Sequence, residues 1–298
     1  MPSGKVSELD LIQRISRKIK NDSSVIRGIG DDTAVLEYSR DKYQLWTADM
    51  LIEGVDFTSG TPAKDIGYKA LACSLSDIAA MGGIPRYGLV SLGIPKAKAR
   101  AFIDGFYSGL LKLARRFRVN IVGGDLSHSD KIVVDVSLIG EAVKKRLVLR
   151  SGAKVNDILL VSGELGGSIY GRHLRFTPRL KESAYLVNNY KVNAMLDISD
   201  GLSLDLSRLC QGSGVGAVVY EELIPVSKDA KDFSEALDMG EDFELLFSLP
   251  LNEARRLIKS GNKGFKAIGE IRPRQEGIKI ISRNCKAREL AAKGYQHF

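Results

Sequence analysis

Apolar and polar residues alternate along this chain in two patterns, one typical of helices and the other typical of strands. In three stretches of the first half, apolar residues recur at every third or fourth position, which predicts amphipathic helices. These helices are expected over residues 9–19, 62–81 and 102–117. Short apolar runs bounded by glycine and acidic residues lie between them and predict strands. The strands are expected within residues 28–57 and over 87–93, 119–122 and 132–143, with the strand at 119–122 buried.

The second half of the chain repeats this alternation of short strands and helices. Strands are expected over residues 157–163, 194–198, 215–220, 243–249 and 278–281. Helices are expected near residues 169–174, 180–189, 202–209 and 253–259. A basic stretch at 143–152 separates the halves, and we place a domain boundary there, which gives domains of residues 1–145 and 146–298. Helices mixed with strands in both halves predict an α+β fold of two domains.

The composition is that of a globular protein and limits the choice of partners. The chain has 298 residues, of which 44% are hydrophobic and 27% are charged, and its net charge is +8. A basic surface favours anionic partners, but the densest basic cluster, Lys144-Lys145-Arg146, is too short for a nucleic-acid-binding tail. We therefore expect no nucleic-acid partner. Three distant cysteines and the lack of a long apolar segment predict a cytoplasmic protein that does not bind membranes.

Several common catalytic motifs are absent from the sequence. It contains no Gly-x-x-x-x-Gly-Lys-Ser/Thr phosphate loop, no Gly-x-Gly-x-x-Gly turn between a strand and a helix, and no protein-kinase signature. The three histidines, His128, His173 and His297, are too scattered to indicate a zinc site or a histidine-activated nucleophile. The chemistry must therefore be sought in other residue types.

Acidic residues recur where apolar runs meet glycine turns. The recurring positions are Asp31, Asp32, Asp49, Asp77, Asp125, Asp197 and Asp200, followed by Glu241, Asp242 and Glu244. So many carboxylates can converge only with cations between them, because like charges raise one another's pKa. Magnesium prefers oxygen ligands and commonly binds substrate phosphates as well. The pattern predicts a magnesium-dependent phosphoryl transferase.

The segments around these acids together resemble the thiamine-monophosphate kinase family. The resemblance extends over residues 28–249 and includes Gly30-Asp31-Asp32-Thr33, Leu75-Ser76-Asp77-Ile78-Ala79-Ala80-Met81-Gly82, Gly123-Gly124-Asp125, Asp197-Ile198-Ser199-Asp200-Gly201 and Gly240-Glu241-Asp242-Phe243-Glu244. The superfamily is that of aminoimidazole ribonucleotide synthetase. The resemblance therefore implies an N-terminal α/β domain that pairs across a homodimer, and a C-terminal α/β domain. It also implies phosphorylation of thiamine monophosphate by ATP, the last step of thiamine diphosphate biosynthesis.

The resemblance further implies roles for individual residues. The implied metal ligands, for magnesium, are Asp32, Thr47, Asp49, Asp77, Asp125, Asp197 and Asp200. The implied ATP-binding residues are Gly124, Asp125, Arg150 and Ser199, of which Asp125 and Arg150 are also implied to be catalytic. The implied contacts to thiamine monophosphate are Asp56, Glu244 and Tyr295. The acceptor is a phosphate oxygen that is already ionised near neutral pH, so the reaction requires no general base.

Some of these residues also have a simpler structural explanation. Asp77 could be a helix cap or an ion-pair partner, Arg150 a surface cation, and Glu244 a strand residue that faces solvent. Lys69 is expected to extend along its helix to solvent, and Trp46 is expected to lie in the core.

The sequence departs from the family pattern at three places. Leu126-Ser127-His128 follows Gly123-Gly124-Asp125, where threonine is usual, and Ala48 and Asp56 replace a hydroxyl residue and a histidine. Two other functions stay open. One is a superfamily member with another acceptor, as in hydrogenase maturation or selenophosphate synthesis, which would carry a reactive cysteine near one terminus; Cys285 lies short of the end and is a poor match. The other is a nucleotide-binding homologue without activity, against which the intact acidic clusters argue.

Overall fold

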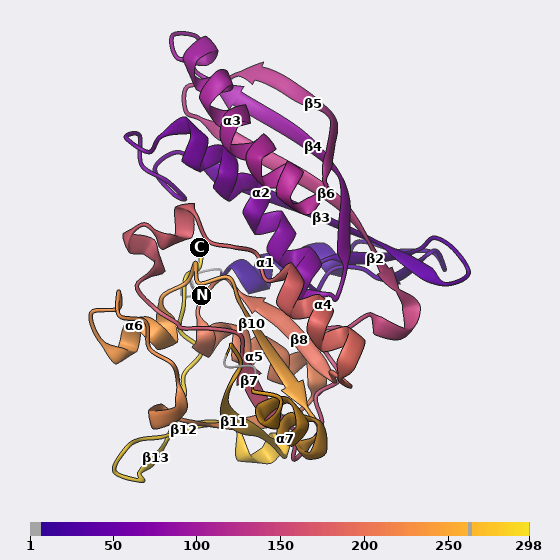
Figure 1. Ribbon diagram of the computed structural model, residues 1–298, viewed down its shortest axis with the longest axis vertical. Coiled ribbons are helices and arrows are strands. Elements are labelled where there is room, and N and C mark those ends of the chain that lie inside the picture. The colour runs from indigo at the N-terminus through magenta and orange to yellow at the C-terminus, as the bar shows by residue number, and fades with distance from the viewer. Residues whose placement is uncertain (1–6, 262–263, 298) are drawn as a thin grey trace, which may run out of the picture.

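The computed structural model describes residues 7–261 and 264–297 of the chain and shows two sheets with helices around them (Figure 1). The first half contains α1 (Glu8–Ser16), β1 (Val25–Arg27), β2 (Ala34–Glu37), β3 (Lys42–Ile52), α2 (Ala63–Ala80), β4 (Ile84–Ile94), α3 (Ala99–Phe117), β5 (Asn120–His128) and β6 (Val133–Val143). Its six strands form one sheet in the order β1-β2-β3-β6-β4-β5. Only β4 and β5 pair in parallel, because α3 connects them and returns the chain to the same end of the sheet.

The second half forms a seven-stranded sheet in the order β13-β12-β9-β11-β7-β10-β8. Its elements are β7 (Ile158–Val161), α4 (Leu180–Asn189), β8 (Ala194–Ile198), α5 (Leu202–Ser213), β9 (Gly216–Tyr220), α6 (Phe233–Asp238), β10 (Glu244–Leu249), α7 (Leu251–Lys259), β11 (Lys266–Arg272), β12 (Ile278–Ile281) and β13 (Ala287–Glu289). The helix predicted near residues 169–174 is wrong: two short 3-10 turns occupy Ser168–Tyr170 and Arg172–Leu174. Gly167 and Gly171, with φ of 71° and 132°, flank the first turn and prevent a continuous helix.

Helix α2 joins the two halves of the molecule. Fourteen of its residues are buried on all sides of the helix, as expected for a helix enclosed by protein. It packs against β3 and β6 of the first sheet and against α4 and β8 of the second half. One hydrophobic core therefore runs from Ile66 of α2 to Met195 of β8 and Phe247 of β10. Because this core is shared, the division between residues 145 and 146 stays a prediction.

Two glycines bring α2 and α3 unusually close together. A Cβ atom added at Gly67 would lie 2.0 Å from the Phe106 carbonyl oxygen, and one at Gly109 would lie 1.7 Å from the Lys64 carbonyl oxygen. Any side chain at either position would therefore force the helices apart. The two helices make backbone contact at this crossing.

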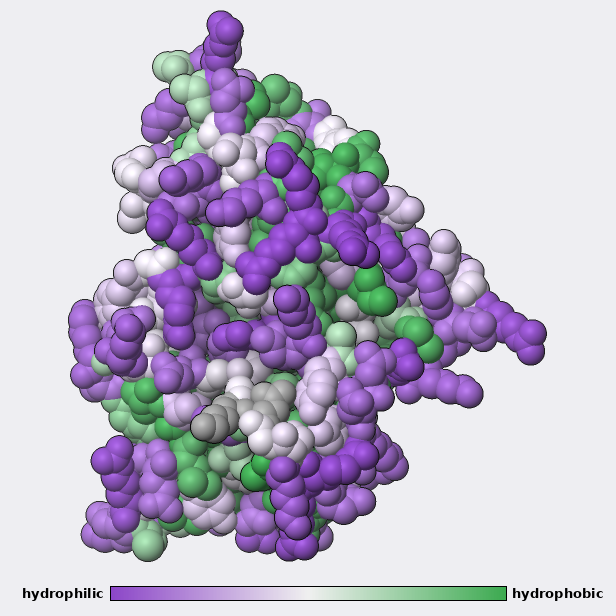
Figure 2. Space-filling view, in the orientation of Figure 1, coloured by the Kyte–Doolittle hydropathy of each residue, from purple (hydrophilic) through white to green (hydrophobic). Residues whose placement is uncertain are grey.

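The face of the first sheet that points away from α2 is open. Alternate residues of β6, such as Val134 and Val136, are buried beneath the helices, whereas the opposite face exposes apolar side chains. Trp46 on β3 is 48% exposed, so its predicted place in the core is wrong. Strand β5 was predicted to be buried, but it is an edge strand in which Val122 and Leu126 are each 60% exposed. Figure 2 shows hydrophobic residues gathered along the upper right of the molecule, over β4 and β5.

Candidate active site

Three carboxylates from distant parts of the chain meet where α2 reaches the second sheet. Asp32 lies in the turn before β2, Asp77 in the last turn of α2, and Asp197 in β8. Each offers a carboxylate oxygen within 4.8 Å of an oxygen of the other two. These residues, named here the acidic trio, have the spacing expected of ligands that share one cation.

Hydroxyl groups hold two acids of the trio, Asp77 and Asp197, and a fourth acid, Asp49, whose Oδ2 accepts the Ser74 hydroxyl at 2.7 Å. Thr47 donates a hydrogen bond to Asp77, so both residues predicted near the metal are in contact. The Ser76 hydroxyl donates to Asp197 Oδ2 at 2.5 Å, which connects α2 to β8. These bonds fix the orientation of the carboxylates in advance of any ligand.

Burial and mutual repulsion make the ionised form of the acidic trio unfavourable. Burial, followed by repulsion from Asp49, Asp197 and Asp32, raises the pKa of Asp77 well above its usual value. Burial and repulsion from Asp32 raise the pKa of Asp197 in the same direction. Asp32 also has a buried oxygen without a hydrogen-bond partner. A hard divalent cation such as Mg²⁺ would offset the repulsion between the carboxylates and would give the unpaired oxygen of Asp32 a partner. The residues present therefore fit this ion.

Arg150 is bound tightly to one side of the trio. Its Nη2 donates to Asp32 Oδ1 at 2.6 Å, and its backbone N–H donates to Asp31 Oδ1 at 3.0 Å. Burial, with repulsion from Asp32, raises the pKa of Asp31 to about 6. Arg150 is therefore held beside the trio and is not merely a surface cation, and Asp31 helps to position it.

Asp200 lies beside the trio without belonging to it. Arg208 donates a hydrogen bond to its side chain and also donates to Asp205 Oδ1 at 2.7 Å. Asp205 in turn accepts the backbone N–H groups of Asp200 and Gly201 at 3.0 and 3.2 Å. Asp205 was not among the predicted site residues, although it follows the Asp197–Gly201 motif closely. Its buried carboxylate fixes the loop that carries Asp200.

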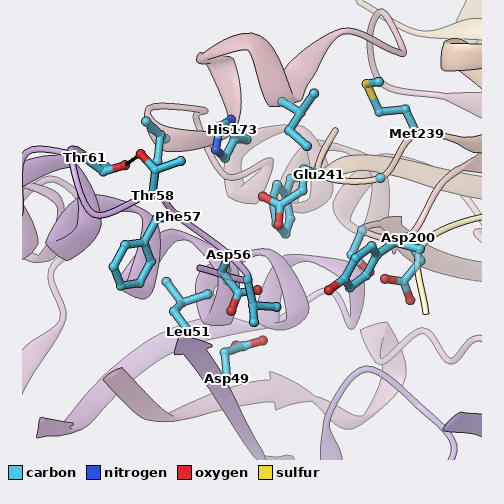
Figure 3. A pocket seen from close by; sticks show the side chains of 18 of the residues that line it. Asp49, Leu51, Asp56, Phe57, Thr58, Thr61, His173, Asp200, Met239 and Glu241 are labelled. Carbon is cyan, nitrogen blue, oxygen red and sulfur yellow. Dashed lines mark hydrogen bonds between the residues drawn. The ribbon is translucent and has the colours of Figure 1, made fainter. Parts of the chain in front are cut away.

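A cavity of about 630 Å³ opens next to the trio, and four acids line it (Figure 3). Asp56 and Glu241 lie close to one another on the wall, with Asp49 beyond Asp56 and Asp200 to one side. Other lining residues are Leu51, Phe57, Tyr170, His173, Ser199, Phe243 and Tyr295. Apolar and aromatic walls with several carboxylates suit a flat organic cation. Asp49 joins the two regions, because it lines the cavity and also repels Asp77.

Comparisons with known proteins place this architecture in a family. Residues 30–142 match the AIR synthase related protein, N-terminal domain, and residues 151–281 match the C-terminal domain. The thiamine-monophosphate kinase of Rhodopirellula baltica is 41% identical over 245 residues, which cover 76% of this chain and 77% of that protein. The one from Bacillus subtilis is 35% identical over 326 residues, covering 98% of this chain and 100% of that protein. The chain belongs to the thiamine-monophosphate kinase family.

Solved structures agree with this family membership. AaThiL complexed with AMPPCP and TMP superposes with a TM-score of 0.87 at 31% identity, covering 100% of this chain and 99% of that chain. The hydrogenase maturation protein HypE in complex with ATP has a TM-score of 0.73 at 19% identity, covering 97% and 95%, which shows a shared fold alone. The chain therefore has the predicted α+β, AIR synthase-like fold and is an enzyme of the kinase class.

Two of the predicted ATP-binding residues, Gly124 and Asp125, lie away from the trio. They sit on β5, which is separated from β3 by β6 and β4. Asp125 is aligned across the sheet with Ser91, Asp135 and Met50, so about 14 Å separates it from β3 at the usual spacing of strands. Asp125 is exposed, and its carboxylate accepts a hydrogen bond from the Ser127 hydroxyl at 3.1 Å. A single chain of this kinase does not bring Asp125 to the other predicted ligands.

Glu244, a predicted substrate contact, does not line the cavity. Its carboxylate is buried, accepts both ends of the Arg179 guanidinium and accepts the Ser162 hydroxyl at 2.6 Å. It neither faces solvent nor lines the cavity, whereas Glu241 does line it. The strand that begins at Glu244 turns this side chain inward, while Glu241 lies in the loop before the strand.

The remaining predicted contacts lie around the cavity. Asp56, Ser199 and Tyr295 all line it, and the Tyr295 N–H donates to the Asp200 carbonyl oxygen at 3.0 Å. His173, which sequence reasoning set aside, also lines the cavity. Among the described residues, no helix combines the length and apolar character needed to cross a membrane.

Proposed function

We propose that this chain transfers the γ-phosphoryl group of ATP to thiamine monophosphate, as the last step of thiamine diphosphate synthesis. A phosphate oxygen of thiamine monophosphate attacks the γ-phosphorus, the bond to the β-phosphate oxygen breaks, and ADP leaves. The observation that carries this proposal is the position of Asp49, which lines the acid-rich cavity and also acts on the acidic trio. Donor phosphates and an organic cation would thus meet at adjacent places.

The acidic trio would hold Mg²⁺, with Thr47, Asp49 and Asp200 nearby. The metal would supply neutralisation of the phosphate charges. Arg150, bound between Asp31 and Asp32, would orient the nucleotide phosphates from the other side. Ser199, at the cavity wall between Asp197 and Asp200, would contact the nucleotide or the acceptor phosphate. The side chains therefore position two phosphate groups in line, which is the principal task in phosphoryl transfer.

The imidazole of His173 at the cavity wall is a weakened base for removing a proton from an alcohol. Burial lowers the pKa of His173, and its Nδ1 lies 3.0 Å from the Ser168 carbonyl oxygen. Among the described residues that line the cavity, the other imidazole is that of His297. An acceptor phosphate needs no such base, whereas the hydroxyl of thiamine does.

We therefore expect rapid turnover with thiamine monophosphate and at least about a hundredfold slower turnover with thiamine, because general base catalysis typically contributes that much. The measurement is ADP release with each acceptor at saturating ATP and Mg²⁺. A panel of carboxylate, amide and carbamoyl acceptors serves as the control for a different substrate class. Comparable rates with thiamine and its monophosphate, or a better acceptor in the panel, would contradict the proposal.

Asp56 is expected to contact the positively charged ring of the acceptor. Its Oδ2 accepts the Ile52 N–H at 2.7 Å, and its side chain lines the cavity. Asp56→Asn should raise the KM for thiamine monophosphate about two- to thirtyfold, as expected for a partly exposed charge contact of roughly 0.5–2 kcal/mol. The KM for ATP should change little. If both KM values and the Mg²⁺ dependence shift together, Asp56 acts on the metal; if neither shifts, it lies outside the site.

We also propose that the protein is a homodimer formed through the open face of the first sheet. Exposed apolar side chains, including Trp46, Met50, Tyr87 and Leu89, favour contact with a second copy. Such pairing would give Gly124 and Asp125 on the edge strand β5 a route to the partner's trio. The three free cysteines, of which Cys73 and Cys210 are buried, support the predicted cytoplasmic location.

A further inference from the structure

Lys69, near the middle of α2, is completely buried, which contradicts the expectation that it extends to solvent. Its Nζ lies 2.9 Å from the Asp56 carbonyl oxygen, to which it donates, and 2.6 Å from Glu241 Oε2. A lysine ammonium is retained in the interior only when partners compensate for the lost water. Both partners of Lys69 are residues that line the cavity, while Lys69 itself lies behind the wall.

The two partners come from opposite halves of the molecule. Asp56 belongs to the loop that follows β3 in the first half, and Glu241 belongs to the loop that precedes β10 in the second half. The second loop is conformationally unusual, because Glu241 and Phe243 have φ of 70° and 51°. Its backbone is held by the Glu241 N–H, which donates to the Ser199 carbonyl oxygen at 2.6 Å.

We propose that Lys69 is a positioning residue for the acceptor, which fixes the Glu241 carboxylate and the Asp56 loop relative to one another at the cavity wall. The acceptor ring, a flat organic cation, would then bind against two carboxylates whose separation is set in advance. The inference rests on the proposed function and extends it by assigning acceptor recognition to a side chain that does not touch the acceptor.

The charges around the cavity favour this role. Four carboxylates line the wall, and Arg208 pairs with Asp200 while Lys69 pairs with Glu241. Burial raises the pKa of Glu241, and the Lys69 ammonium opposes that rise. Lys69 therefore favours the ionised form of Glu241 at the wall, and the four carboxylates outnumber the two cations that pair with them.

The test compares Lys69→Met, Lys69→Arg and Glu241→Gln with the wild type by steady-state kinetics. Lys69→Met should raise the KM for thiamine monophosphate about tenfold to a hundredfold, since truncating one partner of a buried pair disrupts the other. The KM for ATP and kcat should stay within about threefold. Lys69→Arg should restore part of the loss. Lys64→Met, a change at an exposed lysine of the same helix, should alter neither KM.

A neutral isostere of thiamine monophosphate, in which carbon replaces the thiazolium nitrogen, separates charge from shape. Its KM should respond to Lys69→Met by less than about threefold, because the charge contact is absent. If Lys69→Met folds poorly, Glu241→Gln retains the bond from Lys69 to the Asp56 carbonyl and should show the same KM pattern. In the Glu241→Gln background, Lys69→Met should raise the KM by less than it does in the wild type, because only the bond to the Asp56 carbonyl then remains to be lost.

Three results would overturn the inference. They are an unchanged KM for thiamine monophosphate in both folded variants, a fall in kcat with unchanged KM values, and equal losses for the cationic and neutral acceptors. The second result would instead place Lys69 on the transferred phosphoryl group. A wild-type enzyme that neither binds nor phosphorylates thiamine monophosphate would overturn the proposed function itself, and this inference with it.

Discussion

Replacing Asp77 with asparagine is expected to lower turnover at least about a hundredfold while leaving the fold intact, because it removes one charge from a shared cation site. Asp77 offers an oxygen within 4.8 Å of both Asp32 and Asp197, so one cation could be shared by all three. The rate should be measured against Mg²⁺ concentration. Asp104→Asn, at an exposed acid on α3, is the matched control and should keep the wild-type rate.

Thermal unfolding provides a second measurement of the same variant. The pKa of Asp77 is raised in the folded protein, so its stabilising form is the protonated one, and metal-free stability falls as the pH rises through that raised pKa. Asparagine resembles the protonated acid, so metal-free Asp77→Asn should be at least as stable as the wild type at pH 7 to 8. Mg²⁺ should raise the Tm of the wild type but not of the variant. A near-normal rate, or an unchanged response to Mg²⁺, would remove the metal-site interpretation.

An equimolar mixture of Asp125→Asn and Asp77→Asn chains is expected to regain about a quarter of wild-type turnover, although each variant alone should be nearly inactive. In the proposed homodimer, Asp125 of one chain would serve the trio of the other. Half of the randomly assembled dimers would be mixed, and each mixed dimer would contain one complete site. The position of Asp125 on the exposed edge strand, away from its own trio, is the basis of this expectation.

The control for this experiment is a mixture of Asp77→Asn with Asp197→Asn. Both residues belong to the trio of a single chain, so no mixed dimer contains a complete site and no activity should return. The chains should be co-expressed with two different tags, and the mixed dimer should be purified by both. A mixed dimer without activity would show that Asp125 acts within its own chain or not at all. Sedimentation of the wild type as a monomer at micromolar concentration would contradict the dimer.

The sequence was most informative where a regular pattern ended in a chemically distinctive residue. Asp197 ends an apolar strand, and Asp77 ends a helix with a regular apolar pattern, so their elements and much of their surroundings could be predicted. The structure brings both together with Asp32, as the metal-site prediction requires. Elements defined by local periodicity were recovered because local spacing is enough to determine them.

Predictions failed where the answer depended on distant partners. The apolar residues of β5 indicate that its side chains are buried in the working protein. They do not indicate whether the same chain or a partner buries them. Glu241 and Glu244 are three positions apart, and only the inward turn of β10 decides which of them reaches the cavity. Lys69 was expected at the surface because lysine is rarely buried, and its compensating partners lie in two loops far from it in the sequence.

Helix α2, which is in backbone contact with α3, sets the distance between Lys69 and the acidic trio. Lys69 and Asp77 are eight residues apart on this helix, which corresponds to about 12 Å along its axis. The helix itself sets that length, and the close contact at Gly67 and Gly109 holds α2 against α3. The separation between acceptor recognition and the acidic trio is thus built into one rigid element. One inserted residue between Lys69 and Asp77 would turn the carboxylate by about 100° and move it by about 1.5 Å.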